Sequence, residues 1–216
     1  EKGKPIVAVA EIIYDCRTTY LIESKSLKLY FNSFNNMRYE SAEEVKHIVE
    51  RDLSLRLRGS VRVDIRSLAD HTLLSVHQGP GGECIDELDV HCSVYHVQPS
   101  YLATTEEWVE EVLYSDLLKS NCLVTNQPDW GTIQIAYEGK KIIREGLLQY
   151  FVSFRNHNEF HEQCVERIFV DIMTQCRPKK LTVYGRYTRR GGLDINPYRT
   201  TENIWSDRLN LRLSRQ

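Results

Sequence analysis

A thiol and a carboxyl group flank a predicted chain reversal within residues 119–131. Cys122 is followed by a short apolar pair and then by the sequence TNQP, which is typical of a turn. Asn126 tolerates a left-handed backbone and Pro128 fixes its own φ, so the turn should bring Asp129 back towards Cys122. A nucleophile and a proton donor would then share one pocket. A lone cysteine is more often a small buried apolar residue, and an Asp after Pro is more often a turn residue, so the spacing alone leaves both interpretations open.

The second half of the chain predicts the elements that would position this pair. Alternating apolar residues favour a strand after the turn. The segment before the turn is compatible with a helix or a strand, and its continuity with Cys122 favours a strand. Apolar residues at i, i+3, i+4 and i+7 predict two amphipathic helices, and a last pair of strands flanks an Arg-Gly-Gly turn. The predicted elements are strands at 108–118 and 133–137, helices at 147–154 and 165–176, and strands at 181–184 and 193–195.

The first half of the chain shows a related pattern. Ser41 and Glu44 have the spacing of a capping box and should open a helix. The glycine cluster at 78–82 follows no clear strand and opens no helix, so we interpret it as a loop and not as a dinucleotide fingerprint. The predicted elements are a strand at 6–14, a helix carrying Leu27, Tyr30, Phe31 and Phe34, the helix after Ser41 with Val45, Ile48, Val49 and Leu53, and strands at 61–65 and 88–96.

An internal repeat relates the two halves. At an offset of 120 residues, seven positions in the window 22–36 are identical to those in 142–156, which indicates a duplicated module. The modules are predicted as residues 1–98 and 99–216, the second carrying the nucleophile. Because the pair His161-Glu162 has no counterpart in the first module, we expect one active site per chain, assembled from both.

Composition excludes some classes of function. The 216 residues include 28 basic and 30 acidic side chains, so the formal net charge of −2 gives no case for a nucleic-acid-binding surface. No apolar run is long enough to cross a bilayer, and the first residues carry no signal-peptide core. The six cysteines form no Cys-x-x-Cys pair. We expect a cytoplasmic protein with free thiols.

Four stretches, in order along the chain, carry a family resemblance. The sequence resembles the NADPH-dependent 7-cyano-7-deazaguanine reductases, which are the nitrile reductases of queuosine biosynthesis. One such stretch would be a weak signal, whereas four in the family's order are a strong one. The stretches are ESKSLKLY at 23–30, SNCLVTNQPDWG at 120–131, FRNHNEFHEQC at 154–164 and YTRRGGLDINP at 187–197.

The resemblance implies an architecture. It predicts an α+β protein built from tandem tunnelling-fold (T-fold) modules, which are antiparallel sheets with paired helices on one face. Such sheets join side by side through oligomerisation, and a homodimer of two-module chains is expected. Two-module members of the family carry a further segment before this point, so the first sheet is expected to lack a strand.

The resemblance also implies a mechanism. The Cys122 thiolate would attack the nitrile carbon and form a covalent thioimide. Asp129 would give a proton to the nitrogen, provided that Trp130 and nearby carboxylates keep its carboxyl group protonated. Neither side chain can deliver a hydride, so NADPH must supply it. No metal is implied.

The remaining roles are carried over from the family motifs. A carboxylate can accept the adjacent N–H donors of a deazaguanine edge, and this role falls to Glu23 and Glu162. Without the resemblance, both would be interpreted as exposed residues near helix starts. Further substrate contacts are expected from Ile22, Ser24 and His161, and cofactor contacts from Ser24, Lys25, Arg190 and Gly191.

Two other functions are compatible with parts of the pattern. A zinc-dependent cyclohydrolase of the same fold type would use His157, His161 and Cys164, which have i, i+4, i+7 spacing on one helical face. A purine- or pterin-binding module would hold its ligand through Glu162 and would not need Cys122. Metal content separates the first from the reductase, and a covalent adduct on Cys122 separates the second.

Overall fold

The computed structural model describes residues 4–70, 76–202 and 211–216. The chain forms two compact units, residues 1–75 and 76–216, here called the first and second unit. The predicted first module, residues 1–98, therefore includes the beginning of the second unit.

The first unit is a two-stranded antiparallel sheet with two helices. Strand β1 (Ala8–Tyr14) pairs with β2 (Val61–Ser67), and helices α1 (Ser24–Asn32) and α2 (Ala42–Leu57) connect them. Both predicted helices and both predicted strands are confirmed, with shifted ends. The buried residues of this unit come from α2 and β2 and are Val49, Leu53, Leu57, Val61 and Val63.

The capping box at the start of α2 is confirmed in one of its two halves. The Ser41 hydroxyl accepts a hydrogen bond from the N–H of Glu44 at 3.1 Å. The Glu44 carboxylate accepts from the N–H of Glu40 at 2.7 Å, one residue before the cap. The N–H groups of Glu40 and Glu44 are both hydrogen-bonded to side chains, which fixes the beginning of this helix.

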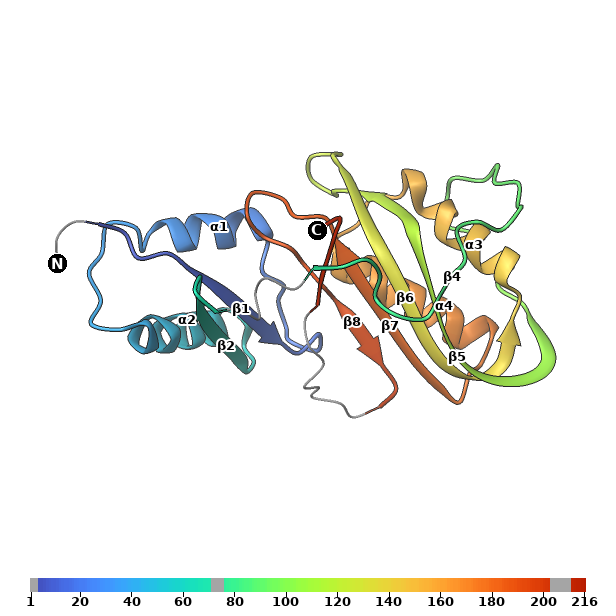
Figure 1. Ribbon diagram of the computed structural model, residues 1–216, viewed down its shortest axis with the longest axis horizontal. Coiled ribbons are helices and arrows are strands. Elements are labelled where there is room, and N and C mark those ends of the chain that lie inside the picture. Colours follow the sequence, from blue (N-terminus) through green and yellow to red (C-terminus); the bar gives the residue numbers. More distant parts are fainter. Residues whose placement is uncertain (1–3, 71–75, 203–210) are drawn as a thin grey trace. The chain divides into compact units, whose positions relative to one another are not determined.

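Between residues 104 and 200, the second unit has the predicted order of two strands, two helices and two strands, with the last strand displaced from its predicted position. Among the described residues, one sheet contains β4 (Glu83–Cys84), β5 (Thr104–Asn121), β6 (Pro128–Ile142), β7 (Lys180–Tyr187) and β8 (Tyr198–Thr200) in that spatial order. The pairs from β5 to β8 are antiparallel, and β4 runs parallel to β5. Helices α3 (Arg144–Ser153) and α4 (His161–Gln175) lie on one face of this sheet (Figure 1).

Short elements complete the second unit. The 3-10 turns are η2 (Pro99–Tyr101) and η3 (Phe154–Asn156), and β3 (Val76–His77) pairs in parallel with β9 (Arg212–Leu213). No helix among the described residues combines the length and the apolar character that crossing a membrane requires.

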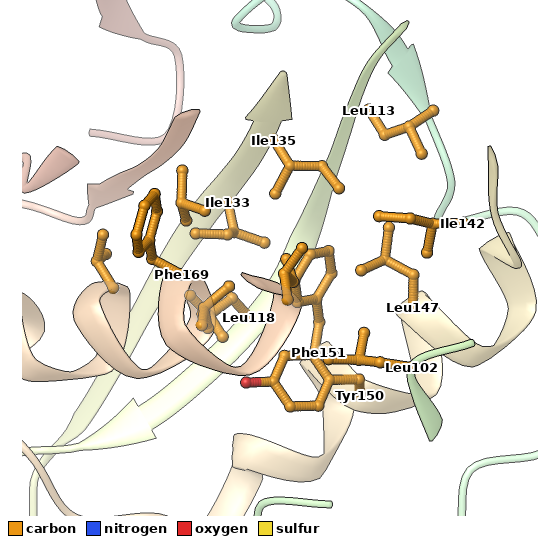
Figure 2. Packing of buried hydrophobic residues seen from close by; sticks show 14 of the residues in the cluster. Leu102, Leu113, Leu118, Ile133, Ile135, Ile142, Leu147, Tyr150, Phe151 and Phe169 are labelled. Carbon is orange, nitrogen blue, oxygen red and sulfur yellow. The ribbon is translucent and has the colours of Figure 1, made fainter. Parts of the chain in front are cut away.

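The core of the second unit lies between the sheet and the two helices. Figure 2 shows Ile133 and Ile135 of β6 pointing towards Phe151 of α3 and Phe169 of α4. Gly185 lets α4 approach β7 closely, since an added Cβ would lie 2.7 Å from a methyl carbon of Val165. The sheet and the helices thus form one packed layer pair, which makes the strand ends that carry the candidate site rigid.

The strand predicted at 88–96 is wrong. Leu88, Val90 and Cys92 pack against the core, which explains their alternation, but this segment forms no strand ladder. Its backbone is satisfied locally, since Val90 N–H donates to the Leu88 carbonyl at 2.9 Å and the His91 carbonyl accepts from the Gln149 side chain at 3.0 Å. Alternation of apolar and polar residues indicates that one side of a segment packs on a surface. It does not require that the segment pairs with a strand.

The last strand is also displaced from its prediction at 193–195. Arg190 and Leu193 exchange two backbone hydrogen bonds around a tight turn, and the strand β8 begins only at Tyr198. Pro197 has no N–H to give to a ladder, so regular pairing with β7 starts after it.

Candidate active site

The loop between β5 and β6 carries Cys122 in a closed turn. Cys122 N–H donates to the Gln127 carbonyl at 2.8 Å, and Asn126 N–H donates back to the Cys122 carbonyl at 2.9 Å. Asn126 has a φ of 55°, as expected for the residue that tolerates a left-handed backbone. The predicted reversal is confirmed, and it places Asp129 opposite Ser120 in the β5–β6 register.

The surroundings of the Cys122 thiol favour its thiolate form. Partial burial raises the pKa of Cys122, but hydrogen bonds from the hydroxyl and N–H of Thr125, the N–H of Val124 and the Arg190 guanidinium outweigh burial and lower the pKa below its usual value. A half-buried thiol with a lowered pKa and several donors around it is the environment of a reactive cysteine.

Asp129 lies between two basic side chains. Its carboxylate is only 3% exposed, with one oxygen 3.2 Å from Nε2 of His161 and the other 2.5 Å from Arg190. Burial raises the pKa of Asp129, but the hydrogen bonds and charges of His161 and Arg190 outweigh burial and lower it. The expected apolar or anionic neighbourhood is therefore wrong, because Trp130 is exposed and the groups in contact are basic. Asp129 is held as a carboxylate.

His161 is fixed from two sides. Its ring stacks on the ring of Tyr187, with centroids 4.0 Å apart and an interplanar angle of 16°. Tyr187 is fully buried at the end of β7, and His161 is the first residue of α4. Gln163 accepts a hydrogen bond from the Phe160 N–H at 3.3 Å and holds that helix start. The imidazole therefore has one orientation, directed at Asp129.

Glu162 follows His161 in the first turn of α4. It is half-buried, and burial raises the pKa of its carboxyl group, partly offset by its own N–H and by His161. Within the described residues, no side chain donates a hydrogen bond to this carboxylate. A half-buried carboxylate without such a donor is suited to accept the donors of a bound molecule.

Four of the predicted site residues belong to the first unit. Glu23 is the N-cap of α1, where its carboxylate accepts from the N–H groups of Lys25 and Ser26 at 2.9 and 2.8 Å. Ile22 packs against the core of its own unit, Ser24 is the first residue of α1, and Lys25 is exposed. A single site built from both modules stays a prediction.

Arg190 and Gly191 form the turn after β7. The Arg190 guanidinium contacts Asp129, the Cys122 thiol and the side-chain oxygen of Gln127, the last at 2.8 Å. Gly191 is exposed with a φ of 61°, which few other residues adopt. The cofactor roles of both residues stay predictions, and the geometry adds a role for Arg190 beside the thiol.

The helical spacing behind the zinc alternative is wrong. His157 lies before α4 in extended backbone, and His161 faces Asp129. One group of possible metal ligands occurs in the described part of the chain and consists of His157, Glu159 and Cys164 within 4.8 Å of one another. Both oxygens of Glu159 already bind Arg167, and burial raises the pKa of the Cys164 thiol to about 12. A cation would have to displace Arg167 and deprotonate that thiol.

Several contributing residues were not predicted. The sequence predicts Thr125 only as a turn residue, yet its hydroxyl contacts the thiol. Tyr187 supplies the stacking surface for His161. Asn158 contacts the loop that carries the thiol. All three lie inside the stretches quoted for the family resemblance, so a closer examination of the polar residues in those stretches could have found them.

Two family profiles match the chain. One, described as "QueF-like protein", covers residues 128–205. The other, described as "Nitrile reductase, 7-cyano-7-deazaguanine-reductase N-term", covers residues 1–65. Among solved structures, an archaeosine synthase QueF-Like in the apo form is similar, with a TM-score of 0.39 and 13% identity, covering 46% of this chain and 98% of that one. That likeness is too weak to support a fold assignment.

Curated relatives match all or nearly all of the chain. A protein of Legionella pneumophila (strain Corby) named NADPH-dependent 7-cyano-7-deazaguanine reductase is 61% identical over 215 residues, which cover 100% of this chain and 75% of that protein. A protein of Coxiella burnetii (strain Dugway 5J108-111) with the same name is 53% identical over 206 residues, covering 95% of this chain and 73% of that protein. The chain belongs to the family of NADPH-dependent 7-cyano-7-deazaguanine reductases.

Proposed function

We propose that this chain reduces the nitrile of 7-cyano-7-deazaguanine to the aminomethyl group with NADPH, as a step of queuosine biosynthesis, through a thioimide on Cys122. One observation carries the proposal: Arg190 contacts both the Cys122 thiol and Asp129, so the candidate nucleophile and the candidate proton-transfer pair share one guanidinium. The names of the relatives supply the substrate and the cofactor.

Cys122 starts the reaction as a thiolate. Its sulfur forms a bond to the nitrile carbon, one π bond of the C≡N group breaks, and the nitrogen takes up a proton to give a thioimide. Asp129 is assigned to this proton transfer together with His161, with which it forms an ion pair. Because Asp129 is held as a carboxylate, the imidazolium form of His161 carries the proton and Asp129 stabilises it.

The donor chemistry of the predicted cofactor residues fits a dinucleotide phosphate. Lys25 presents an exposed ammonium group in the first turn of α1, and Gly191 presents backbone in an exposed turn. NADPH, when bound, supplies the two hydrides that convert a nitrile to an amine, with two protons taken from the protein and solvent. Ser24 and Arg190 complete the proposed contacts.

Glu162 is the proposed recognition group for the base. Its carboxylate can accept the ring N–H and the exocyclic amine of a deazaguanine at the same time. Its half-burial makes that pairing selective, since a base lacking those donors would leave a partly desolvated carboxylate unpaired. Glu23 is proposed as a second acceptor, and Ile22 and Ser24 as further contacts.

The proposed assembly is a cytoplasmic homodimer of tandem T-fold modules that does not bind nucleic acid directly. The order of elements in the second unit and the repeated helix pair support the tandem modules in this proposal. Light scattering of the full-length protein tests it, and a monomer that is active at assay concentration would contradict it.

Stoichiometry tests the proposed reaction. With 7-cyano-7-deazaguanine as substrate, two equivalents of NADPH should be oxidised for every equivalent of amine formed. The loss of absorbance at 340 nm measures this oxidation. Oxidation of NADPH without the nitrile, or no oxidation with it, would contradict the proposal.

A further inference from the structure

The loop that carries Cys122 has little packing of its own. Leu123 and Val124 are 50% and 69% exposed, so the apolar core does not hold the loop in place. The N–H groups that face the thiol belong to Val124 and Thr125 within this loop. Their direction depends on how the two ends of the loop, Asn121 and Asn126, are held.

The backbone around Asn158 holds the first of these ends. Asn121 N–H donates to the His157 carbonyl at 2.8 Å, and Glu159 N–H donates to the Asn121 carbonyl at 3.2 Å. Asn121 and Asn158 therefore form an isolated parallel bridge between the end of β5 and the connection that leads into α4.

The side chain of Asn158 contacts both ends. Its Nδ2 donates to the side-chain oxygen of Asn126 at 2.9 Å, and its Oδ1 accepts from Nδ2 of Asn121 at 3.3 Å. The second contact is the weaker, and Asn121 is also held by Lys119, whose ammonium donates to its side-chain oxygen at 2.7 Å. The Asn158 side chain therefore acts mainly through its contact with Asn126.

We propose that Asn158 is a positioning residue for Cys122, because one amide joins the beginning and the end of the loop and so keeps the N–H groups of Val124 and Thr125 directed at the thiol. This inference rests on the proposed role of Cys122 as nucleophile. Asn158 also lies three residues before His161, so the same amide fixes the loop relative to the helix start that carries the proton-transfer and recognition groups.

Two variants test this contact from its two sides. Asn158→Ala removes both side-chain hydrogen bonds. Asn126→Gly removes only the acceptor on the loop and keeps the left-handed turn, since glycine adopts a positive φ without strain. Asn156→Ala is the matched control, because Asn156 is an exposed asparagine in the same connection.

Two rates are measured for each variant. The first is formation of the nitrile adduct without NADPH, followed by intact mass. The second is alkylation of Cys122 by iodoacetamide from pH 5 to 10. It is followed by peptide mapping, because Cys16 and Cys84 are exposed and would react as well. The charged group in contact with the thiol is Arg190, which is paired with Asp129 and is unchanged in all variants.

Asn158→Ala should slow adduct formation about tenfold, the effect of one to two lost hydrogen bonds, and should move the alkylation midpoint to higher pH. Asn126→Gly should show the same effects to a smaller degree. The double variant should be no slower than Asn158→Ala, because both changes break one contact. Asn156→Ala should behave as the wild type.

Unchanged adduct rate and alkylation midpoint in folded Asn158→Ala would overturn the proposal. If Asn158→Ala does not fold, Asn126→Gly decides, and wild-type behaviour of that variant would overturn the proposal. If the wild type forms no adduct, the proposed function fails, while the alkylation midpoints of the same variants still decide whether Asn158 positions the thiol.

Discussion

The two units contain the same aromatic cluster in different surroundings. At the end of α1, the ring of Tyr30 meets edge to face the ring of Phe34, which follows the helix, with centroids 5.1 Å apart at 74°. In α3 and η3, Tyr150 and Phe154 do the same at 5.4 Å and 89°. Tyr150 and Phe154 are completely buried, whereas Tyr30 and Phe34 are only partly covered. The local packing is the same in both units, and the depth of the core is what differs.

The hydrogen bond that accompanies this cluster is also present twice. Tyr30 donates to Asp52 of α2 at 3.0 Å, and Tyr150 donates to Asp171 of α4 at 2.7 Å. In each unit the bond ties the first helix to the second. The two units therefore share the same helix pair, which can carry different functional side chains in each unit.

The two units carry different residues at the start of their second helices, α2 and α4. At the repeat offset, His161 and Glu162 of α4 correspond to Ser41 and Ala42 of α2. Ser41 caps its helix, whereas in α4 the first two positions hold a side chain bonded to Asp129 and a carboxylate suited to a ligand. The first unit uses this position to cap its helix, whereas the second unit carries there the two residues that we propose for proton transfer and substrate recognition.

The largest contrast between the units is expected for their thiols. Cys122→Ala should lower kcat by about 10⁴-fold or more, because no other group in the loop can form the covalent intermediate. Cys16→Ala removes an exposed thiol of the first unit and should leave turnover unchanged. Steady-state NADPH oxidation measures both, and comparable losses would remove the distinction between the units.

Asp129 provides the next largest effect. Asp129→Asn should lower kcat by about 10² to 10⁴-fold, since an amide does not stabilise the charged form of His161. Asp52→Asn, at the hydrogen bond of the first unit, should leave kcat unchanged. Normal turnover of Asp129→Asn across the pH range would exclude Asp129 from proton transfer.

Glu162 should affect substrate binding more than turnover. Glu162→Gln should raise KM for the nitrile by about 10- to 100-fold, because it removes a charged acceptor. Since burial raises the pKa of Glu162, wild-type KM should increase as pH falls through that raised pKa, at a higher pH than for an exposed Glu. KM of Glu162→Gln should lack this increase, and an identical pH profile would contradict the assignment.

The two corresponding tyrosines, Tyr30 and Tyr150, should differ in how much they contribute to the free energy of unfolding. Tyr150→Phe leaves Asp171 without its buried partner and should cost about 1 to 3 kcal/mol of unfolding free energy, whereas Tyr30→Phe should cost about 0.5 to 1 kcal/mol because Asp52 can bind water. Denaturant titration of the two variants measures this difference. Equal losses would mean that burial does not distinguish the two clusters.

The smallest predicted effect concerns acid stability. The pKa of Asp129 is lowered below its usual value of 3.8, so its pairing stabilises the fold above that pH and is lost as pH falls through the lower, folded-state pKa. The unfolding free energies of wild type and Asp129→Asn should therefore converge below about pH 4. A difference that stays constant to pH 2 would argue against the ionised pair.

The sequence predicts local structure better than it predicts the site. Spacing of apolar residues located the helices and most strands, because periodicity reports burial directly. The strand at 88–96 was wrong because alternation there reflects packing without a ladder. The ionisation of Asp129 could not be predicted, since it depends on Arg190, which is distant in sequence and reaches it only through the turn after β7. The contact between Asn158 and Asn126 depends in the same way on tertiary structure.

The central claim is that the Cys122 thiolate forms a covalent bond with the nitrile. Intact-protein mass should be measured after incubation with 7-cyano-7-deazaguanine and without NADPH, for wild type and Cys122→Ala. An increase by one ligand mass in the wild type alone is the predicted result. Folded wild-type protein without an adduct, or an adduct that persists in Cys122→Ala, would contradict it.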